Sequence, residues 1–129
     1  MSSYEIHPII LTLSNGIQLV YLKRKAFVAH LGVMIHAGSR FELPDEEGLA
    51  HFLEHCIFKG TKKRKAFDIF TDLDSVGGEL NAYTNKEEIC IHTSFRKLHF
   101  EIASELLGDI LLNASFPEEE IAKEKEVVL

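Results

Sequence analysis

Two stretches of the chain alternate between apolar and polar residues, as strands do when they bury one face of a sheet. Residues 27–37 place Leu31 and Val33 on one face and mostly small or polar residues on the other, and residues 89–95 alternate in the same way. A short strand is expected between them, at residues 80–84. These segments predict a sheet with one face against a core.

An N-terminal hairpin is predicted by two short apolar runs, residues 9–13 and 17–22. They flank Asn15-Gly16, a dipeptide that readily adopts the tight turn between antiparallel strands. The two runs are therefore expected to pair with each other.

Four helices are predicted from apolar residues at helical spacing and from signals at the helix ends. The expected spans are residues 48–58, 66–76, 97–113 and 117–129. Their expected core residues include Phe67, Phe70, Leu73, Leu98, Ile102, Leu106 and Ile110. The succession of strands, helices, strands and helices predicts an α+β fold with a mainly antiparallel sheet packed against helices.

Composition places the chain among globular proteins and excludes some classes of binding partner. Of 129 residues, 46% are hydrophobic and 26% are charged, which excludes a disordered or low-complexity chain. The net charge of -6 argues against a nucleic-acid partner and against docking on a membrane. No apolar run is long enough to span a bilayer, and the N-terminus carries no secretory or transit signal. We therefore expect a cytoplasmic protein, with an organelle matrix as the alternative.

The segment that suggests chemistry lies in the predicted helix at residues 48–58. His51 and His55 are four positions apart and share a helix face, and Glu54 lies about 60° to one side of His51. Two imidazoles at this spacing can bind one zinc ion, and a carboxylate beside them can take a proton from the bound water. The order His-x-x-Glu-His is that of inverzincin metallopeptidases. The alternative is a pair of structural histidines on an apolar helix.

Further matches surround this motif, at residues 37–40, 47–64 and 76–84. With them, the chain from about Leu13 to its C-terminus resembles the pitrilysin and mitochondrial processing peptidase family. The resemblance implies that residues 1–129 are the N-terminal fragment of a zinc metallopeptidase, a partial pitrilysin-type domain that ends inside a helix. It also implies zinc as the cofactor and a peptide or unfolded polypeptide as the substrate.

The resemblance assigns roles to individual residues. His51 and His55 would be zinc ligands, and Glu54 would polarise the attacking water and accept its proton. An edge strand would receive the substrate backbone as an added strand. The residues implied for that edge are Asn81, Ala82 and Tyr83. The alternative for these three is an ordinary edge strand that follows a Gly-Gly turn.

The third zinc ligand of the family falls outside this sequence. In the family it is a glutamate that lies about two helical turns after another glutamate. Residues 124–129 resemble the start of that helix, so Glu124 corresponds to the earlier glutamate, with a catalytic role, and the ligand would lie two positions beyond Leu129. We therefore expect this chain by itself to bind zinc weakly and to lack peptidase activity.

The helical pattern gives a separate reason to single out Glu124. It shares a helix face with Ile121 and Val128, and an acid on an apolar stripe is unusual unless it has a partner. The alternative is a solvated acid in a charged helix.

Two other interpretations stay open. The chain could be a non-catalytic interaction or assembly subunit of the same family, which acts through the rest of the parent protein or a related subunit. The basic residues 59–65 could also mark a nucleic-acid patch, but the acidic net charge and the lack of interleaved aromatic residues favour a solvated loop.

Overall fold

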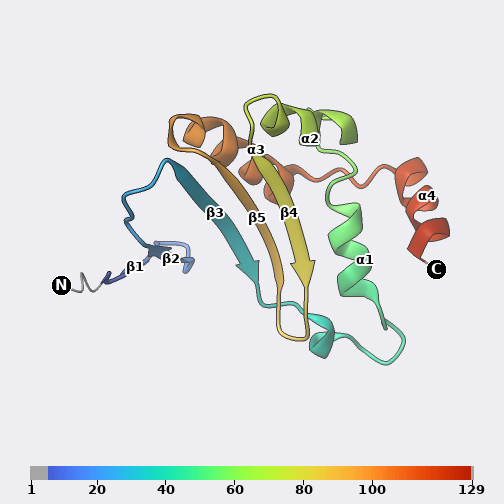
Figure 1. The fold of residues 1–129 in the computed structure, drawn as a ribbon. Coiled ribbons are helices and arrows are strands. Elements are labelled where there is room, and N and C mark those ends of the chain that lie inside the picture. The colour runs from blue at the N-terminus through green and yellow to red at the C-terminus, as the bar shows by residue number, and fades with distance from the viewer. Residues whose placement is uncertain (1–5, 129) are drawn as a thin grey trace.

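The computed structural model of the protein describes residues 6–128. These residues form two separate antiparallel sheets and four α-helices (Figure 1). The predicted α+β class is confirmed. The end of the chain at Leu129, which the predicted last helix includes, lies outside the described residues.

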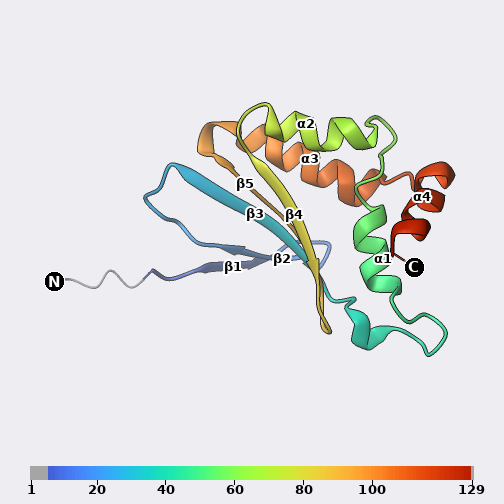
Figure 2. The ribbon, with the colours of Figure 1, turned by 45° about the vertical axis from the view of Figure 1, so that its right-hand side comes forward.

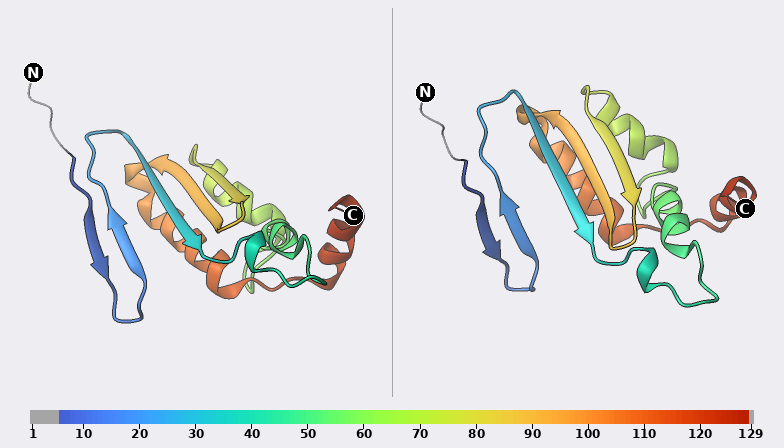
Figure 3. Two further views of the ribbon diagram at one scale, coloured as in Figure 1. Left: turned by 90° about the horizontal axis from the view of Figure 1, so that it is seen from below. Right: turned by 60° about the horizontal axis from the view of Figure 1, so that its bottom comes forward.

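The first sheet is the predicted hairpin of β1 (Ile9–Thr12) and β2 (Gln18–Tyr21). Gly16 adopts a φ of 88° in its turn, a conformation that glycine reaches without a steric penalty. The hairpin extends away from the helices (Figures 1 and 3), and every residue of both strands is exposed. Because its residues are exposed, this hairpin gains little from burial. An isolated pair of strands is only marginally stable in water.

The second sheet has the strand order β3-β5-β4, with all neighbours antiparallel. Its strands are β3 (Val28–Ile35), β4 (Glu79–Thr84) and β5 (Ile89–Arg96). The central strand β5 is the most buried of the three, and α2 and α3 cover one face of the sheet (Figure 2). The apolar side chains of this core that are almost completely buried include Ile69, Leu73, Ile91, Leu106 and Ile110.

The helices are shorter at their ends than the sequence predicts. They are α1 (Leu49–Cys56), α2 (Ala66–Asp74), α3 (Phe100–Asn113) and α4 (Glu118–Val128), with short 3-10 turns at Ser39–Phe41 and Lys97–His99. Within residues 6–128, none of the helices has both the length and the apolar character needed to cross a membrane.

Part of the predicted helical core is wrong. Phe67 is 77% exposed, because α2 buries Ile69 and Leu73, and a residue two positions from Ile69 points to the opposite side of a helix. Phe70, also predicted for the core, is 47% exposed.

The core prediction fails in the same way at the start of the third helix. Leu98 lies in the 3-10 turn before α3, where helical spacing does not apply, and it is 66% exposed. Ile102 is 40% exposed, because α3 turns a different stripe, which includes Ala103 and Leu107, toward the sheet.

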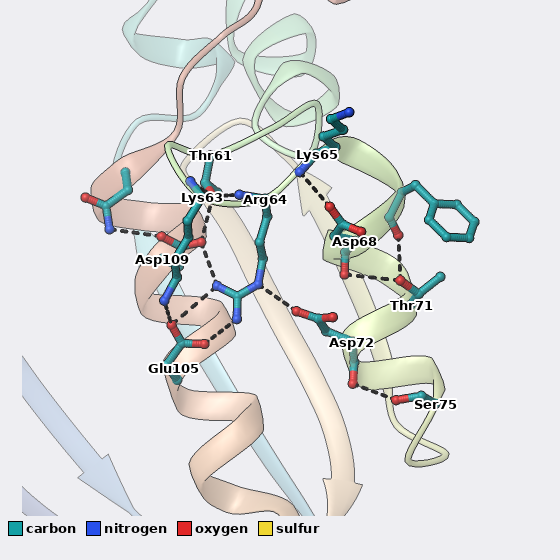
Figure 4. A network of polar contacts seen from close by, with 12 residues as sticks. Thr61, Lys63, Arg64, Lys65, Asp68, Thr71, Asp72, Ser75, Glu105 and Asp109 are labelled. Carbon is teal, nitrogen blue, oxygen red and sulfur yellow. Dashed lines mark hydrogen bonds and ion pairs between the residues drawn. The ribbon is translucent and has the colours of Figure 1, made fainter.

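An ion-pair network fastens the loop after α1 to α2 and α3 (Figure 4). Arg64 donates from Nη1 to Oδ2 of Asp109 and from Nε to Oδ2 of Asp72, each at 2.7 Å. It also pairs with Glu105, and Thr61 donates its hydroxyl to Asp109 at 2.7 Å. The side chain of Arg64 is only 14% exposed, so the prediction of a solvated basic loop is wrong at this position.

The network shifts the pKa values of its acids. Burial raises the pKa of Asp109, but hydrogen bonds from Thr61, Arg64 and Asn113 outweigh burial and leave the pKa below its usual range. The hydrogen bond from Arg64, followed by that from Lys63, lowers the pKa of Glu105. Both acids therefore bind protons less readily in the folded chain than in the unfolded chain.

The segment before α1 is held by the turn between β4 and β5. The N–H of Gly38 donates to the carbonyl of Glu87 at 3.1 Å, and the N–H of Ser39 donates to the carbonyl of Asn85 at 3.0 Å. A Cβ on Gly38 would lie 2.4 Å from the backbone nitrogen of Glu88. The φ of Gly38 is -74°, which any residue can adopt, so lack of space alone excludes a side chain.

The substitution Gly38→Ala should lower the free energy of unfolding by roughly 2 kcal/mol, because the added carbon must displace backbone. Gly108 in α3 is the matched control, since a Cβ there meets nothing within 4 Å. Gly108→Ala should raise stability by about 1 kcal/mol, because alanine is the better helix former. Urea unfolding of both variants measures the difference. Similar shifts for the two variants would contradict close packing at Gly38.

The acid sensitivity of folding should depend on Arg64. Because the pKa values of Asp109 and Glu105 are lowered in the folded state, their stabilisation is complete above the unfolded-state pKa of about 4 and is lost as pH falls through the lowered values. Arg64→Met should lower the free energy of unfolding by roughly 3 kcal/mol at neutral pH, because a buried carboxylate loses its cation. The acid slope of its unfolding free energy should also be shallower.

Urea unfolding between roughly pH 3 and pH 7 measures this slope. Lys62→Met is the control, because Lys62 is exposed in the same loop and its loss changes the net charge equally. If the unfolding free energy of Arg64→Met falls with acid as steeply as that of this control, Arg64 is not the cause of the lowered pKa values.

Candidate active site

Helix α1 is capped by a carboxylate from the preceding segment. Glu42 accepts hydrogen bonds from the backbone N–H of Gly48 at 2.9 Å and of Ala50 at 2.8 Å. These bonds satisfy donors that have no partner within the first turn of a helix. Ala50 and Cys56 are buried in the interior. Helix α1 also contacts β4 and α4.

The two histidines of α1 direct the same ring nitrogen toward each other. Nε2 of His51 lies 3.0 Å from Nε2 of His55, and the rings are nearly perpendicular, with their centroids 4.5 Å apart. Two nitrogens that bind one tetrahedral zinc ion at about 2 Å would be about 3.3 Å apart. The spacing of this donor pair therefore fits a shared metal ion.

Glu124 joins this pair from α4. Its Oε1 accepts a hydrogen bond from Nδ1 of His55 at 2.6 Å, although the two residues are 69 positions apart in the sequence. Glu124 is only 7% exposed, so the expectation that an acid on this apolar stripe has a partner is confirmed. An ionised carboxylate can only accept, so Nδ1 of His55 donates, and in the neutral ring Nε2 presents a lone pair.

Lys59 keeps Glu124 in its ionised form. The Nζ of Lys59 donates to Oε2 of Glu124 at 2.8 Å, and this bond lowers the pKa of Glu124. Burial raises that pKa and the bond from His55 lowers it, with a net lowering. The carboxylate therefore remains an acceptor for His55 at neutral pH.

Thr84 holds the carboxylate of Glu54. Its hydroxyl, at the end of β4, donates a hydrogen bond to Oε2 of Glu54 on α1. Strand β4 and helix α1 lie side by side (Figure 1). Both residues are half-buried. The bond gives the carboxylate a defined direction beside the histidine pair.

Strand β4 is an edge strand of its sheet, as predicted. Asn81 and Tyr83 are exposed on it, and Ala82 is half-buried against the core. Hydrogen bonding with the thiol of Cys90, together with burial and the nearby Glu88, raises the pKa of Tyr83 to about 12. Its hydroxyl therefore stays protonated and donates to Glu88 at 3.3 Å.

A hollow of about 390 Å³ lies beside His51, between residues 45–49 and α4. Its walls combine acidic, apolar and basic side chains. His51 borders this hollow and is exposed, so its imidazole is accessible from solvent.

No set of three or more His, Cys, Asp or Glu side chains in residues 6–128 is arranged to hold a metal ion. The described chain brings together two of the predicted ligands, His51 and His55, and sets Glu124 behind one of them. It places Glu54 on the same helix, bonded to Thr84, and the three predicted residues of the edge strand on β4.

Sequence reasoning missed two residues of this site, Thr84 and Lys59. Thr84 closes one of the segments that match the family, but its contact with Glu54 depends on how β4 lies against α1. Lys59 is the first residue of a basic run, and nothing in that run distinguishes it from its neighbours.

Comparisons with known proteins support a peptidase family. The sequence model of the family described as insulinase (peptidase family M16) matches residues 19–129. A protein of Rickettsia bellii named an uncharacterized zinc protease is 42% identical over 91% of this chain and 29% of its own length. A probable mitochondrial-processing peptidase subunit beta of Arabidopsis thaliana is 40% identical over 93% of this chain and 23% of its own length.

A solved structure agrees with these sequence comparisons. The crystal structure of a protease from Helicobacter pylori has a TM-score of 0.91 and 30% identity to this chain. The match covers 95% of this chain and 30% of that protease, so this chain spans less than a third of these relatives. From the family match over most of its length, the chain belongs to the insulinase family of peptidases, M16.

Proposed function

We propose that this chain supplies the two histidine ligands and the general base of a zinc-dependent endopeptidase. The observation that carries the proposal is that the Nε2 atoms of His51 and His55 lie 3.0 Å apart. The other ring nitrogen of His55, Nδ1, is hydrogen-bonded to Glu124. A second partner that fixes the ring of a ligating histidine is a common property of zinc sites. The names of the relatives, which include zinc proteases, support zinc as the metal.

Glu54 is proposed as the general base. His51 and His55 would hold the zinc ion, which would supply Lewis-acid activation of a bound water and of the peptide carbonyl. Glu54 would take a proton from the attacking water and pass it to the leaving amine. Thr84 orients Glu54 for this transfer, because its hydroxyl occupies one carboxylate oxygen and leaves the other free of any described partner.

The proposed substrate is a peptide or an unfolded polypeptide that binds in an extended conformation. Asn81, Ala82 and Tyr83 lie on an edge strand, whose free backbone groups can pair with a further strand. Thr84 follows directly on the same strand and contacts Glu54. A substrate strand on β4 would therefore be placed relative to the proposed base through this one residue.

The proposed third ligand, by resemblance to the family, is a glutamate two positions beyond Leu129. We propose that zinc binding is completed there or by a related subunit, and that residues 1–129 alone bind zinc weakly without hydrolysing peptides. A cytoplasmic location, without a nucleic-acid or membrane partner, remains part of the proposal.

Zinc binding to this chain is the first test. We expect weak, saturable binding that depends on both histidines, so that His51→Ala and His55→Ala each lower the zinc affinity at least about tenfold. His99→Ala is the control, because His99 lies outside the site, at the start of α3. Calorimetric titration and elemental analysis after dialysis measure affinity and stoichiometry. Zinc affinity that is unchanged in both variants would refute the site.

The role of Glu54 is tested in a full-length peptidase that contains this segment. Glu54→Gln keeps the shape of the side chain but removes its basicity, so turnover should fall at least about a thousandfold while zinc remains bound. Glu101→Gln is the matched control, because Glu101 is exposed on α3. Peptide hydrolysis and metal content are measured on the same preparations. Turnover that survives in Glu54→Gln would exclude Glu54 as the base.

A further inference from the structure

Lys59 lies where the end of α1 meets α4. It follows α1 by three residues, and its backbone N–H donates to the carbonyl of Cys56 at 3.1 Å. Its side chain, 29% exposed, turns toward α4 and donates to Oε2 of Glu124 at 2.8 Å. The basic run that begins with Lys59 therefore contains one lysine that belongs to the candidate site.

The carboxylate of Glu124 has one described partner on each oxygen. Oε1 accepts from His55 at 2.6 Å, and Oε2 accepts from Lys59 at 2.8 Å. The side chain is 9% exposed, so little water can replace either donor. Hydrogen bonds between charged groups are short and directional, and the ammonium therefore limits rotation of the carboxylate.

The direction of this carboxylate matters for the neutral form of His55. A neutral imidazole carries its proton on only one nitrogen, and the partner of the other nitrogen decides which. While Oε1 of Glu124 faces Nδ1, the proton stays on Nδ1, and the lone pair of Nε2 points toward His51. If the carboxylate turned away, the proton could move to Nε2, where it would block a metal ion.

We propose that Lys59 is a positioning residue of the metal site, whose ammonium orients Glu124 and thereby keeps the proton of His55 on Nδ1. This inference rests on the proposed function, in which Nε2 of His55 binds the metal ion. It differs from a merely structural role, in which Lys59 would stabilise the contact between α1 and α4 without affecting the histidine. The ammonium of Lys59 is bonded to Glu124, so it would act on the metal site through that carboxylate.

The tautomer of His55 is the direct test. Long-range ¹H–¹⁵N spectra of the labelled, metal-free chain at fixed neutral pH distinguish a protonated ring nitrogen from an unprotonated one, and His55→Gln identifies the signals. The wild-type chain should show His55 with its proton on Nδ1. Lys59→Met should raise the share of the Nε2–H form several-fold, and Lys59→Arg should restore the wild-type spectrum.

Zinc affinity is the second measurement. Lys59→Met should weaken binding about tenfold, which is the lower end of the range for partners of metal-binding histidines. Lys62→Met is the matched control, because it removes the same charge from an exposed position in the same loop. Circular dichroism checks that each variant is folded. If Lys59→Met does not fold, Lys59→Gln is measured instead, because it keeps a donor without the charge. The tautomer of His55 in its spectrum then decides between a positioning and a merely structural role of Lys59.

The outcomes separate this inference from the proposed function. If the tautomer of His55 is unchanged in the Lys59 variants, the inference is overturned, whatever happens to stability. If zinc affinity depends on His55 but not on Lys59, the proposed function stands and the inference fails. If zinc affinity is unchanged in His55→Ala, the proposed function fails, and a tautomer change in Lys59→Met would then support only the orientation of Glu124.

Discussion

The hydrogen bonds of Glu124 to His55 and Lys59 are the interaction on which the candidate site depends. A carboxylate that is 7% exposed requires donors nearby, because an unpaired buried charge is costly. Glu124 finds both donors at the end of α1, so the position of α4 and the orientation of the His55 ring are set by the same contact. Packing and chemistry are therefore coupled at this point.

Helix α1 is held at its start, its middle and beyond its end. Glu42 satisfies donors of the first turn, Thr84 binds the carboxylate of Glu54, and Arg64 ties the following loop to α2 and α3. Each of these contacts involves a charged or polar side chain with a defined direction. Such support limits the movement of the histidine pair, and ligands held in place in advance favour metal binding.

The open parts of the structure contrast with this supported helix. Strand β4 keeps a free edge, the hollow beside His51 is open to solvent, and the β1–β2 hairpin exposes apolar side chains. Exposed apolar side chains gathered on one element are typical of regions that contact further polypeptide. The described residues thus bury one continuous core, between the three-stranded sheet and α2 and α3.

Much of the local structure follows from the sequence alone. Alternation in β3 and β5, the Asn15-Gly16 turn and the helical spacing of His51 and His55 depend on neighbours within a few positions, and the structure agrees with each of them. The family resemblance also rests on such short segments. The predictions that failed, such as burial of Phe67, required knowing which face of a helix meets the sheet.

Only the tertiary structure decided which distant side chains meet. The partners of His55 and Glu54 are 69 and 30 positions away, and no local pattern identifies Lys59 among the neighbouring lysines or Thr84 at the end of its strand. The sequence determined the ligand types and their place on one helix face, because helical geometry is local. Packing of α4 and β4 against α1 determined their orientation, because hydrogen bonds act over about 3 Å whatever the separation along the chain.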